Sequence, residues 1–389
     1  LREVVAGDVI ELGQMKVEFV HMCHSIPDAC LLAIHTPLGT IVHTGDFKLD
    51  PTPVDGYLSD YETLSRLGSD GVLGLFTDCV HVETPGYTPS EQVVGKTLRP
   101  IIQHAPGRVI IATLASLISR VQQIMDLGHG CGRKVALLGR SLHNNVQVAV
   151  ELGYLRIPEG VIIDIEDTKR YPDNEVLVIC TGAQGEPTSA LSRIANDDSR
   201  HWNVKPGDLY ILSATPIPGN ETSVGRVINN LFTQGAEVIY SSMAQVHVSG
   251  HASQEEHKLM LGLLPPKYVV PIHGERRHRV ARGDAGQQRR LLLRRAGVHE
   301  GVRGQRRRQQ RRAEQGAAGF LQPPVTPFDV GGLHSVLIRK HAAHPDVRGH
   351  LVFRESDNLA LQVGGGVDAR LHDQEAPPEV APEMTRMAS

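Results

Sequence analysis

The sequence predicts an α/β protein in which one unit, built on a mixed sheet, is interrupted by a second unit with a mainly parallel sheet. Strand-like runs dominate residues 1–88, helices and strands alternate between about residues 89 and 243, and strand–helix patterning of the first kind returns after residue 253. Short apolar strands separated by helices of about 10 to 15 residues are typical of a three-layer α/β unit. The sheet of residues 1–88 is therefore expected to resume after residue 252.

The first unit opens with runs in which β-branched and apolar residues partly alternate, as in a sheet with one buried face. These runs are DVIEL (8–12), MKVEFVHM (15–22), ACLLAIHT (29–36) and TIVHTGDF (40–47). Two polar segments, HSIPD at 24–28 and HTGDFKLD at 43–50, lie at strand ends, where active sites are commonly built. A helix near 59–67 and a strand at 72–78 complete this part.

The second unit shows the alternation most clearly. We expect helices at 90–105, 116–128, 141–153 and 221–235, and strands at 108–113, 134–139, 175–182, 208–214 and 236–241. A helix at 253–264 and a strand at 267–273 follow. No repeat with a period of about 20 to 50 residues occurs, which argues against a solenoid.

Composition places the chain among soluble globular proteins, with 40% hydrophobic and 21% charged residues. A formal net charge of −3 argues against a strongly basic nucleic-acid-coating protein. The five cysteines are scattered without a CxxC pair, which favours a reducing cytoplasm over a disulfide framework. No apolar run approaches about 18 residues, so no membrane partner is expected. Because the chain begins at Leu1 rather than Met, we expect an N-terminal truncation.

The sequence changes character beyond Glu275. Residues 276–312 contain 14 arginines and no lysine, and apolar periodicity is lost. One interpretation is a basic disordered arm that binds RNA phosphates. The favoured one is out-of-frame translation of GC-rich coding sequence, which would explain the abrupt replacement of lysine by arginine. Strand-like runs return within residues 325–363, which leaves a small C-terminal fold open.

Three groups of residues are candidates for chemistry. His24 and Asp46 lie at the ends of neighbouring predicted strands, and an imidazole with a carboxylate suits zinc or manganese. The alternative is a hydrogen-bonded loop histidine and a turn-forming aspartate. His273 ends an apolar strand and is followed by Gly and Glu, which makes a packed core histidine unusual there.

The segment HVSGHAS places His247 and His251 around Ser249 and Gly250. Backbone N–H groups and a hydroxyl could approach an anion closely here, and the next helix offers its N-terminus. The alternative is a capping box for that helix, headed by Ser253, and the two interpretations are compatible.

Other polar residues give weaker signals. Asp78 ends its strand and either orients a histidine or caps the next turn. Four further histidines are expected on surfaces or in ordinary hydrogen bonds: His81, His104, His129 and His143. The GAQGEP and PIPGNE loops are glycine-containing strand-to-helix turns, and neither GxGxxG spacing nor a P-loop is present.

The motifs taken together resemble the ribonuclease J family, in the β-CASP branch of the metallo-β-lactamase superfamily. They are HSIPD, HTGDFK, TDCVHVETPGYTPSE, ASLISRVQQI, GRSLHNN, TGAQGEPTSAL, PIPGNE, HVSGHASQEE and PIHGE. The resemblance covers about residues 1–276. It implies a partial metallo-β-lactamase αββα sandwich, at 1–88 and 253–276, interrupted by a three-layer α/β β-CASP domain at 89–252, with the Arg-rich tail at 277–389.

The resemblance also implies roles for single residues at a metal site. His24 is similar to a metal-ligand histidine, His273 to the late histidine ligand, and Asp46 to the carboxylate that bridges two metals and so takes part in catalysis. His251 resembles the histidine that stabilises the transition state or protonates the leaving group. Asp78 matches the acidic residue of the first β-CASP motif.

For the substrate, the resemblance implies that His247, Ser249 and Gly250 hold an RNA phosphate, and that Ser116 lines a pocket for a 5′-monophosphate. The implied cofactor is Zn²⁺, two per complete site, with Mn²⁺ or Mg²⁺ as alternatives. The implied activity is 5′-to-3′ exonuclease with endonuclease action on single-stranded RNA, in RNA processing and decay. The implied setting is the cytoplasm, as a homodimer or homotetramer.

The sequence departs from the family pattern in two places. The HxHxDH signature, which supplies four of the usual metal ligands, is absent from the chain, and the resemblance places it upstream of Leu1. The motif after Asp78 reads CVHVE where the family more often has STNAE. We therefore expect an incomplete metal site and no activity from this chain alone. A non-catalytic RNA-binding remnant and another β-CASP RNA-processing endonuclease stay open as alternatives.

Overall fold

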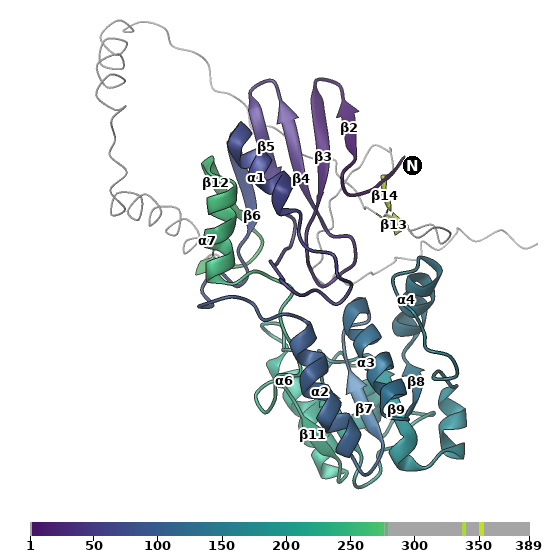
Figure 1. Cartoon of the computed structure of the whole chain (residues 1–389). Helices are drawn as coiled ribbons and strands as arrows, with labels where there is room; N and C mark the ends of the chain where they lie inside the picture. The colour runs from purple at the N-terminus through teal and green to yellow at the C-terminus, as the bar shows by residue number, and fades with distance from the viewer. Residues whose placement is uncertain (1, 276, 279–336, 340–349, 354–389) are drawn as a thin grey trace, which may run out of the picture.

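A computed structural model describes residues 2–275, 277–278, 337–339 and 350–353. The described chain forms two large sheets in separate lobes, joined where the chain passes from one to the other and back (Figure 1). This is the α/β arrangement of an interrupted unit and an inserted unit that the sequence predicts.

The interrupted unit is built on a six-stranded mixed sheet in the order β12-β6-β5-β4-β3-β2. Its strands are β2 (Val9–Leu12), β3 (Met15–His21), β4 (Cys30–Thr36), β5 (Gly39–His43), β6 (Val72–Asp78) and β12 (Pro266–Ile272). The strands β2 to β5 pair antiparallel with their neighbours, whereas β5, β6 and β12 run parallel. Because β12 pairs with β6, the chain does return to its first sheet after the insertion.

Two helices cover one face of this sheet, α1 (Tyr61–Asp70) and α7 (Gln254–Leu263), which lie side by side in Figure 1. The α1 helix begins where the Asp60 carboxylate accepts the backbone N–H of Thr63 at 2.9 Å. It ends at Gly71, whose φ of 99° suits a residue without a Cβ. Buried leucines and methionine of both helices pack on β-strand residues in one core.

The inserted unit is a five-stranded parallel sheet in the order β11-β10-β7-β9-β8. Its strands are β7 (Val109–Ala112), β8 (Lys134–Leu138), β9 (Val176–Cys180), β10 (Leu209–Leu212) and β11 (Glu237–Ile239). Its helices are α2 (Gln92–His104), α3 (Ile118–Gly130), α4 (Arg140–Glu151), α5 (Ala190–Ala195) and α6 (Glu221–Thr233).

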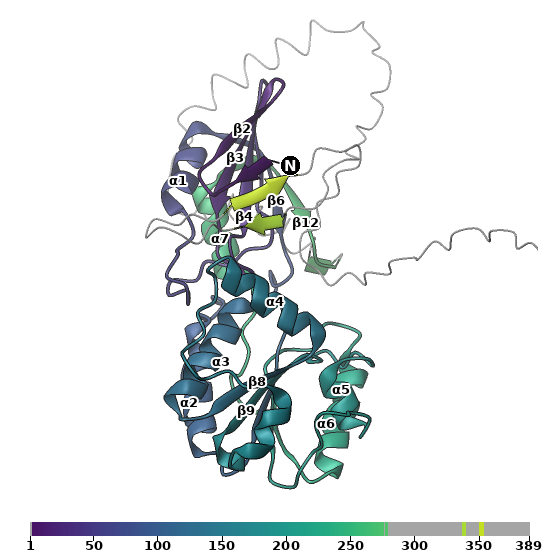
Figure 2. The same cartoon turned by 90° about the vertical axis from the view of Figure 1, so that its right-hand side faces the viewer.

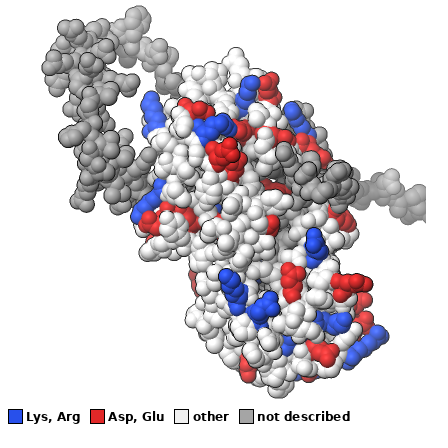
Figure 3. Space-filling model, in the orientation of Figure 1, with Lys and Arg blue, Asp and Glu red and all other residues white. Residues whose placement is uncertain are grey.

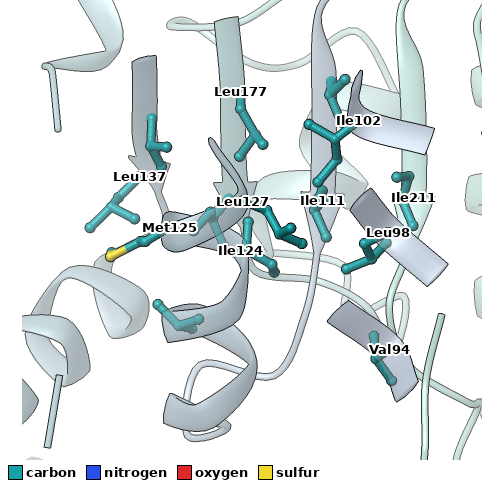
Figure 4. Packing of buried hydrophobic residues seen from close by; sticks show 14 of the residues in the cluster. Val94, Leu98, Ile102, Ile111, Ile124, Met125, Leu127, Leu137, Leu177 and Ile211 are labelled. Carbon is teal, nitrogen blue, oxygen red and sulfur yellow. The ribbon is translucent and has the colours of Figure 1, made fainter. Parts of the chain in front are cut away.

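Helices cover both faces of the parallel sheet, which makes the insert three layers thick (Figure 2). Residues of α2, α3 and α4 bury their apolar side chains on one face, and residues of α5 and α6 on the other. Figure 4 shows the first of these cores, where α2 and α3 place Leu98, Ile102, Ile124 and Leu127 against the strands. Since β7 and β9 are buried on both faces, their sequences are continuously apolar rather than alternating.

Four described elements have no counterpart among the predicted ones: β1 (Arg2–Val4), α5, and the 3₁₀ helices at Ile165–Arg170 and Asp173–Glu175. Near the chain's end, β14 (His350–Phe353) pairs with both β1 and β13 (Leu337–Arg339). Two of the strand-like runs noted within residues 325–363 therefore form strands. The Arg-rich segment and both interpretations of it lie outside the described residues, and the domain boundaries stay a prediction.

Candidate functional site

Three parallel strands bring predicted site residues to one edge of the mixed sheet. Because β5, β6 and β12 run parallel, their carboxyl ends meet at the same edge, and polar loops follow each of them. Asp46 lies just after β5, Asp78 is the last residue of β6, and His273 follows β12. The backbone N–H of Asp78 donates to the Thr44 hydroxyl at 3.1 Å, which fixes the ends of β5 and β6 together.

His24 reaches the same edge from the antiparallel side. The residue before it, Cys23, pairs with Lys48 in an isolated antiparallel bridge, so the HSIPD and HTGDFK loops lie next to each other. The Nδ1 of His24 is 2.8 Å from the carbonyl oxygen of Gly250, and since a carbonyl only accepts, Nδ1 carries the hydrogen. The acceptor nitrogen Nε2 then lies 3.8 Å from Asp46 Oδ2 and 3.1 Å from the Ser25 hydroxyl.

Gly250 is where the HVSGHAS segment approaches His24 most closely. A Cβ on Gly250 would lie 2.9 Å from His24 Cε1 and from Ser25 Cβ, closer than side-chain atoms pack. Glycine is required here by the close approach of two loops rather than by an unusual backbone angle. The segment therefore contributes more than the two predicted histidines, because its Gly250 carbonyl also orients His24.

His251 is held from three sides. Its Nδ1 donates to Asp78 Oδ2 at 2.7 Å, its backbone N–H donates to the Ser249 hydroxyl at 3.0 Å, and its carbonyl accepts from the Thr88 hydroxyl at 2.8 Å. Asp78 also accepts the backbone N–H of Val80 through Oδ1, so it both orients a histidine and caps the next turn. These contacts leave His251 Nε2 as the nitrogen available to the centre.

The pKa values of His24 and His251 are shifted in opposite directions. Burial lowers the pKa of His251, but the hydrogen bond and charge of Asp78, together with Asp46, outweigh it and leave that pKa above its ordinary 6.5. Burial also raises the pKa of Asp78, yet the His251 contact leaves it lowered. By contrast, burial and the nearby His251 ring lower the pKa of His24 to about 4. At neutral pH His24 is thus a neutral ligand-type imidazole, whereas the contacts of His251 favour its protonated form.

The donor set fits a divalent metal ion. Ligand atoms of His24, Asp46 and His251 all lie within 4.8 Å of one another. Asp46 Oδ2 is buried without a hydrogen-bond partner, and burial raises the pKa of Asp46 to about 6, with Asp78 adding to the rise against the opposing histidines. A cation would compensate this poorly solvated carboxylate, and imidazole with carboxylate is a zinc-type ligand set.

His273 lies at the rim of the centre. Its Nε2 is 4.0 Å from Asp46 Oδ1, its ring centroid is 5.4 Å from that of His251, and its side chain is 37% exposed. The His273 backbone has a φ of 57°, uncommon for a residue with a Cβ, and its carbonyl accepts from the Cys79 thiol. The structure thus brings together His24, Asp46, Asp78, His251 and His273, while their individual roles stay predictions.

Two predicted substrate-binding residues lie apart from this cluster. The Nδ1 of His247 is buried without a hydrogen-bond partner, and burial followed by the charge of Arg120 lowers the pKa of His247 to about 3. Ser116 is exposed in the turn between β7 and α3, on the inserted unit. Ser249 and Gly250, in contrast, directly contact His251 and His24.

His81 lies near the centre and makes an ordinary hydrogen bond, as expected, with 3.3 Å between its Nδ1 and the Thr84 hydroxyl oxygen. Its side chain is half-buried, and its ring stacks near His251 with 6.1 Å between centroids and 28° between planes. Its position three residues after the strand-end Asp78 was a usable signal of this proximity. Sequence reasoning did not single out two buried ion pairs where the two units meet, Lys48 with Asp50 and Arg120 with Glu91.

Charges of both signs are interspersed over the face seen in Figure 3, on both lobes, without a large area of one sign. In the part of the chain that the structure describes, every helix is too short or too polar to cross a membrane.

Comparison with family models gives two matches. Residues 106–231 match the model described as the ribonuclease J β-CASP domain, and residues 236–284 match that of a Zn-dependent metallo-hydrolase RNA specificity domain. The first coincides with most of the inserted parallel sheet. The second contains the HVSGHAS segment, α7, β12 and His273.

Curated relatives agree with these matches. The chain is 47% identical over 281 residues to ribonuclease J of Thermus thermophilus, which covers 72% of this chain and 49% of that protein. It is 47% identical over 269 residues to ribonuclease J of Helicobacter pylori strain J99, covering 69% of this chain and 39% of the relative. It is 41% identical over 288 residues to ribonuclease J2 of Bacillus subtilis, covering 74% of this chain and 52% of the relative. The chain spans about half the length of these relatives, or less.

A solved structure shares the fold. The crystal structure of a protein of unknown function from Enterococcus faecalis V583 superposes with a TM-score of 0.50 at 19% sequence identity. The match covers 69% of this chain and 60% of that one. At this identity the likeness concerns the α/β architecture alone.

Proposed function

The chain belongs to the ribonuclease J family, and from this premise we propose that the whole protein acts as a metal-dependent ribonuclease that hydrolyses RNA phosphodiesters. The observation that carries the proposal is the cluster of His24, Asp46 and His251, in which a buried carboxylate oxygen without a partner faces imidazole nitrogens. We propose 5′-to-3′ exonuclease action with endonuclease action beside it.

We propose that His24, Asp46 and His273 hold zinc, with manganese or magnesium as alternatives, and that a complete site holds two ions. Bound metal would lower the pKa of a water molecule to give a nucleophile and neutralise charge on the phosphate. His24 is prepared for this role because its Nδ1–H is taken by the Gly250 carbonyl, which directs the lone pair of Nε2 towards Asp46. Asp46 faces both histidines, Oδ2 towards His24 and Oδ1 towards His273.

His251 supplies the proton in this proposal. Asp78 orients its ring through Nδ1 and holds the imidazolium form, so Nε2 can donate a proton to the departing oxygen of the RNA chain. The Ser249 hydroxyl and the backbone at Gly250 would bind the phosphate beside it. His247, whose ring is neutral and buried, would complete this phosphate contact from the side of the inserted unit.

The proposed substrate is single-stranded RNA with a 5′-monophosphate, in which Ser116 and the loops of the inserted unit receive the 5′ end. The proposed setting is the cytoplasm, and the proposed assembly is a homodimer or homotetramer.

A second candidate function is RNA binding without hydrolysis. The number of metal ligands favours it. Within the described residues, one group of three side chains has metal-ligand spacing, and two bound ions would need more ligands than three. The sequence itself contains no HxHxDH signature, which in the family supplies further ligands. The two candidates predict the same RNA partner and differ in bound metal.

Zinc stoichiometry and RNA cleavage together distinguish the candidates. The whole protein and this chain alone would each be saturated with Zn²⁺, freed of excess by gel filtration, and incubated with a 5′-monophosphorylated single-stranded oligonucleotide. We expect the whole protein to retain zinc and to hydrolyse the RNA in a reaction that a chelator abolishes, and this chain alone to be inactive. RNA binding by the whole protein with substoichiometric zinc and no cleavage would select the binding function instead, and the absence of both would contradict each candidate.

A further inference from the structure

Arg120, on α3 of the inserted unit, is fully buried, yet its guanidinium joins three separate parts of the chain. Its Nε and Nη2 donate to the two carboxylate oxygens of Glu91, the latter at 2.9 Å. Its Nη1 donates to the carbonyl of Val246 at 3.0 Å and to Ser213. The side chain has 0% exposure, so water satisfies none of these bonds.

Val246 directly precedes the phosphate segment, by which we mean residues 247–251. Its carbonyl accepts from Arg120 and also from the Ser213 hydroxyl, at 2.6 Å. The far end of the same segment is fixed by the Thr88 hydroxyl, which donates to the His251 carbonyl. Arg120 therefore holds the end of the segment that lies farthest from the metal-type cluster.

Glu91 connects this end to the loop that carries Asp46. Its backbone N–H donates to Asp50 Oδ2 at 2.9 Å, and the same carboxylate oxygen is 3.0 Å from the Lys48 ammonium. Lys48 and Asp50 are both buried and lie within four residues of Asp46. A continuous line of buried hydrogen bonds thus runs from the HTGDFK loop through Glu91 and Arg120 to the phosphate segment.

Fold stability alone is a poor explanation for a buried ion pair of this kind, because the cost of removing two charges from water offsets much of their attraction. Its geometry is more informative. The planar guanidinium binds a carboxylate with one edge and a carbonyl with the other, which a lysine ammonium on a flexible chain cannot reproduce. The pair therefore fixes distance and direction between α3, Glu91 and Val246.

We propose that Arg120 is a positioning residue for RNA phosphate binding, acting through the Val246 carbonyl to set the phosphate segment against the HTGDFK loop. This proposal rests on the proposed function in that the segment is taken to contact RNA. Arg120 itself, being buried, does not touch the substrate.

The chain contains a matched control. Arg133 is also a buried arginine of the inserted unit, 3% exposed, and its guanidinium donates to backbone carbonyls away from the segment. Those carbonyls belong to Ile102, Ala105, Gly107 and Val176. Arg120→Lys and Arg133→Lys each keep the charge and lose the planar fork, so both are expected to lower the melting temperature.

Two readouts test the positioning role in the full chain. Metal-free protein in EDTA would be titrated with a 5′-monophosphorylated single-stranded RNA, and the amides of residues 247–251 would be followed by hydrogen exchange. Arg120→Lys is expected to weaken RNA binding at least tenfold and to accelerate exchange of these amides, because a displaced segment loses oriented contacts. Arg133→Lys is expected to leave both within twofold of wild type.

Equal RNA affinity and equal exchange in the two variants would overturn the positioning role. Failure of wild-type protein to bind RNA would contradict the proposed function instead, and hydrogen exchange would still decide whether Arg120 orders the segment. If Arg120→Lys does not fold, Glu91→Gln removes the charge of the pair while keeping a hydrogen-bond acceptor, and the same two readouts apply.

Discussion

At the scale of single residues, the hydrogen bond between His251 and Asp78 raises the pKa of the histidine and lowers that of the aspartate. The pKa of His251 is raised, so its contribution to stability is complete below 6.5 and is lost as pH rises through the raised value. The pKa of Asp78 is lowered, so its contribution is present above 3.8 and is lost as pH falls through the lowered value. Both contributions are present between pH 3.8 and 6.5, where the Asp78 carboxylate and the His251 imidazolium are both charged.

Asp78→Asn tests the origin of this charge. Removing the carboxylate leaves burial as the dominant influence on His251, so its pKa is expected to fall from above 6.5 to below it. An NMR titration of the imidazole Cε1–H in metal-free protein measures this shift. An unchanged His251 pKa in Asp78→Asn would show that the pair does not carry the proton as described.

Gly250→Ala tests the close approach of the two loops. The added Cβ would displace His24 or the phosphate segment, with an expected loss of about 1–3 kcal/mol in unfolding free energy. Zinc affinity is expected to fall roughly 10- to 100-fold, because the Gly250 carbonyl orients His24. Calorimetry measures both quantities.

Gly262→Ala is the control for this substitution. Gly262 lies in α7, where an added Cβ meets nothing within 4 Å. It is therefore expected to be neutral or stabilising by up to about 1 kcal/mol and to leave zinc affinity unchanged. Equal behaviour of the two alanine variants would exclude the packing role assigned to Gly250.

At the scale of elements, α7 joins the phosphate segment to the rest of the fold through its first turn. The capping box of Ser253 and Glu256 is present, as the sequence suggested. The same buried carboxylate also accepts the backbone N–H groups of Leu49 and Thr88. One helix start thus ties together the HTGDFK loop, the entry to the inserted unit and the segment before α7.

Glu256→Ala is expected to lower the free energy of unfolding by roughly 3 kcal/mol, because three buried backbone donors lose their acceptor. Glu255→Ala is the matched control, since that neighbour is partly exposed and pairs with Lys258 in a surface i,i+3 contact. Urea denaturation of both variants measures the difference. A decrease in unfolding free energy below about 1 kcal/mol for Glu256→Ala would contradict the claim that its carboxylate holds the three segments together.

Most helices and strands could be predicted from the sequence because their periodicity is local. The strands of the inserted sheet are continuous apolar runs and its long helices are amphipathic, so their expected ends lie within a few residues of those observed. The α5 helix was not predicted because six residues, ALSRIA, are too few to show a helical period. The return of the chain to its first sheet followed from the return of the earlier pattern, whereas the pairing of β12 with β6 is seen only in the structure.

The site could be predicted only in part, for a physical reason. His24, Asp46 and His273 were recognisable as polar residues at strand ends, but the Asp78–His251 bond spans 173 residues and local pattern left Asp78 open between two roles. The Glu91–Arg120 pair was missed because each residue lies in an ordinary helical pattern. Such a pair is informative because it is buried, and burial depends on tertiary packing. Composition and residue spacing do not reveal tertiary packing.

At the scale of the whole molecule, the centre is assembled by two passes of the chain, one before and one after the inserted parallel sheet. The first pass supplies His24, Asp46 and Asp78 from the mixed sheet, and the second supplies His251 and His273. The inserted unit contributes no residue to the metal-type cluster among the described residues, but Arg120 fixes the segment that carries His251. We expect substitutions in the buried contacts between the two units, such as those of Arg120, to alter RNA binding without altering the hydrophobic core of either unit.

Metal-dependent cleavage of 5′-monophosphorylated RNA by wild type and His251→Ala, with RNA binding measured in parallel, tests the proposed function most directly. With zinc supplied, we expect the whole wild-type protein to hydrolyse the RNA and its His251→Ala variant to be slower by about 100- to 10,000-fold at similar RNA affinity. His104→Ala, an exposed histidine at the end of α2, is expected to match wild type. Equal rates for wild type and His251→Ala would contradict the assignment of His251 and of the centre as the place of hydrolysis.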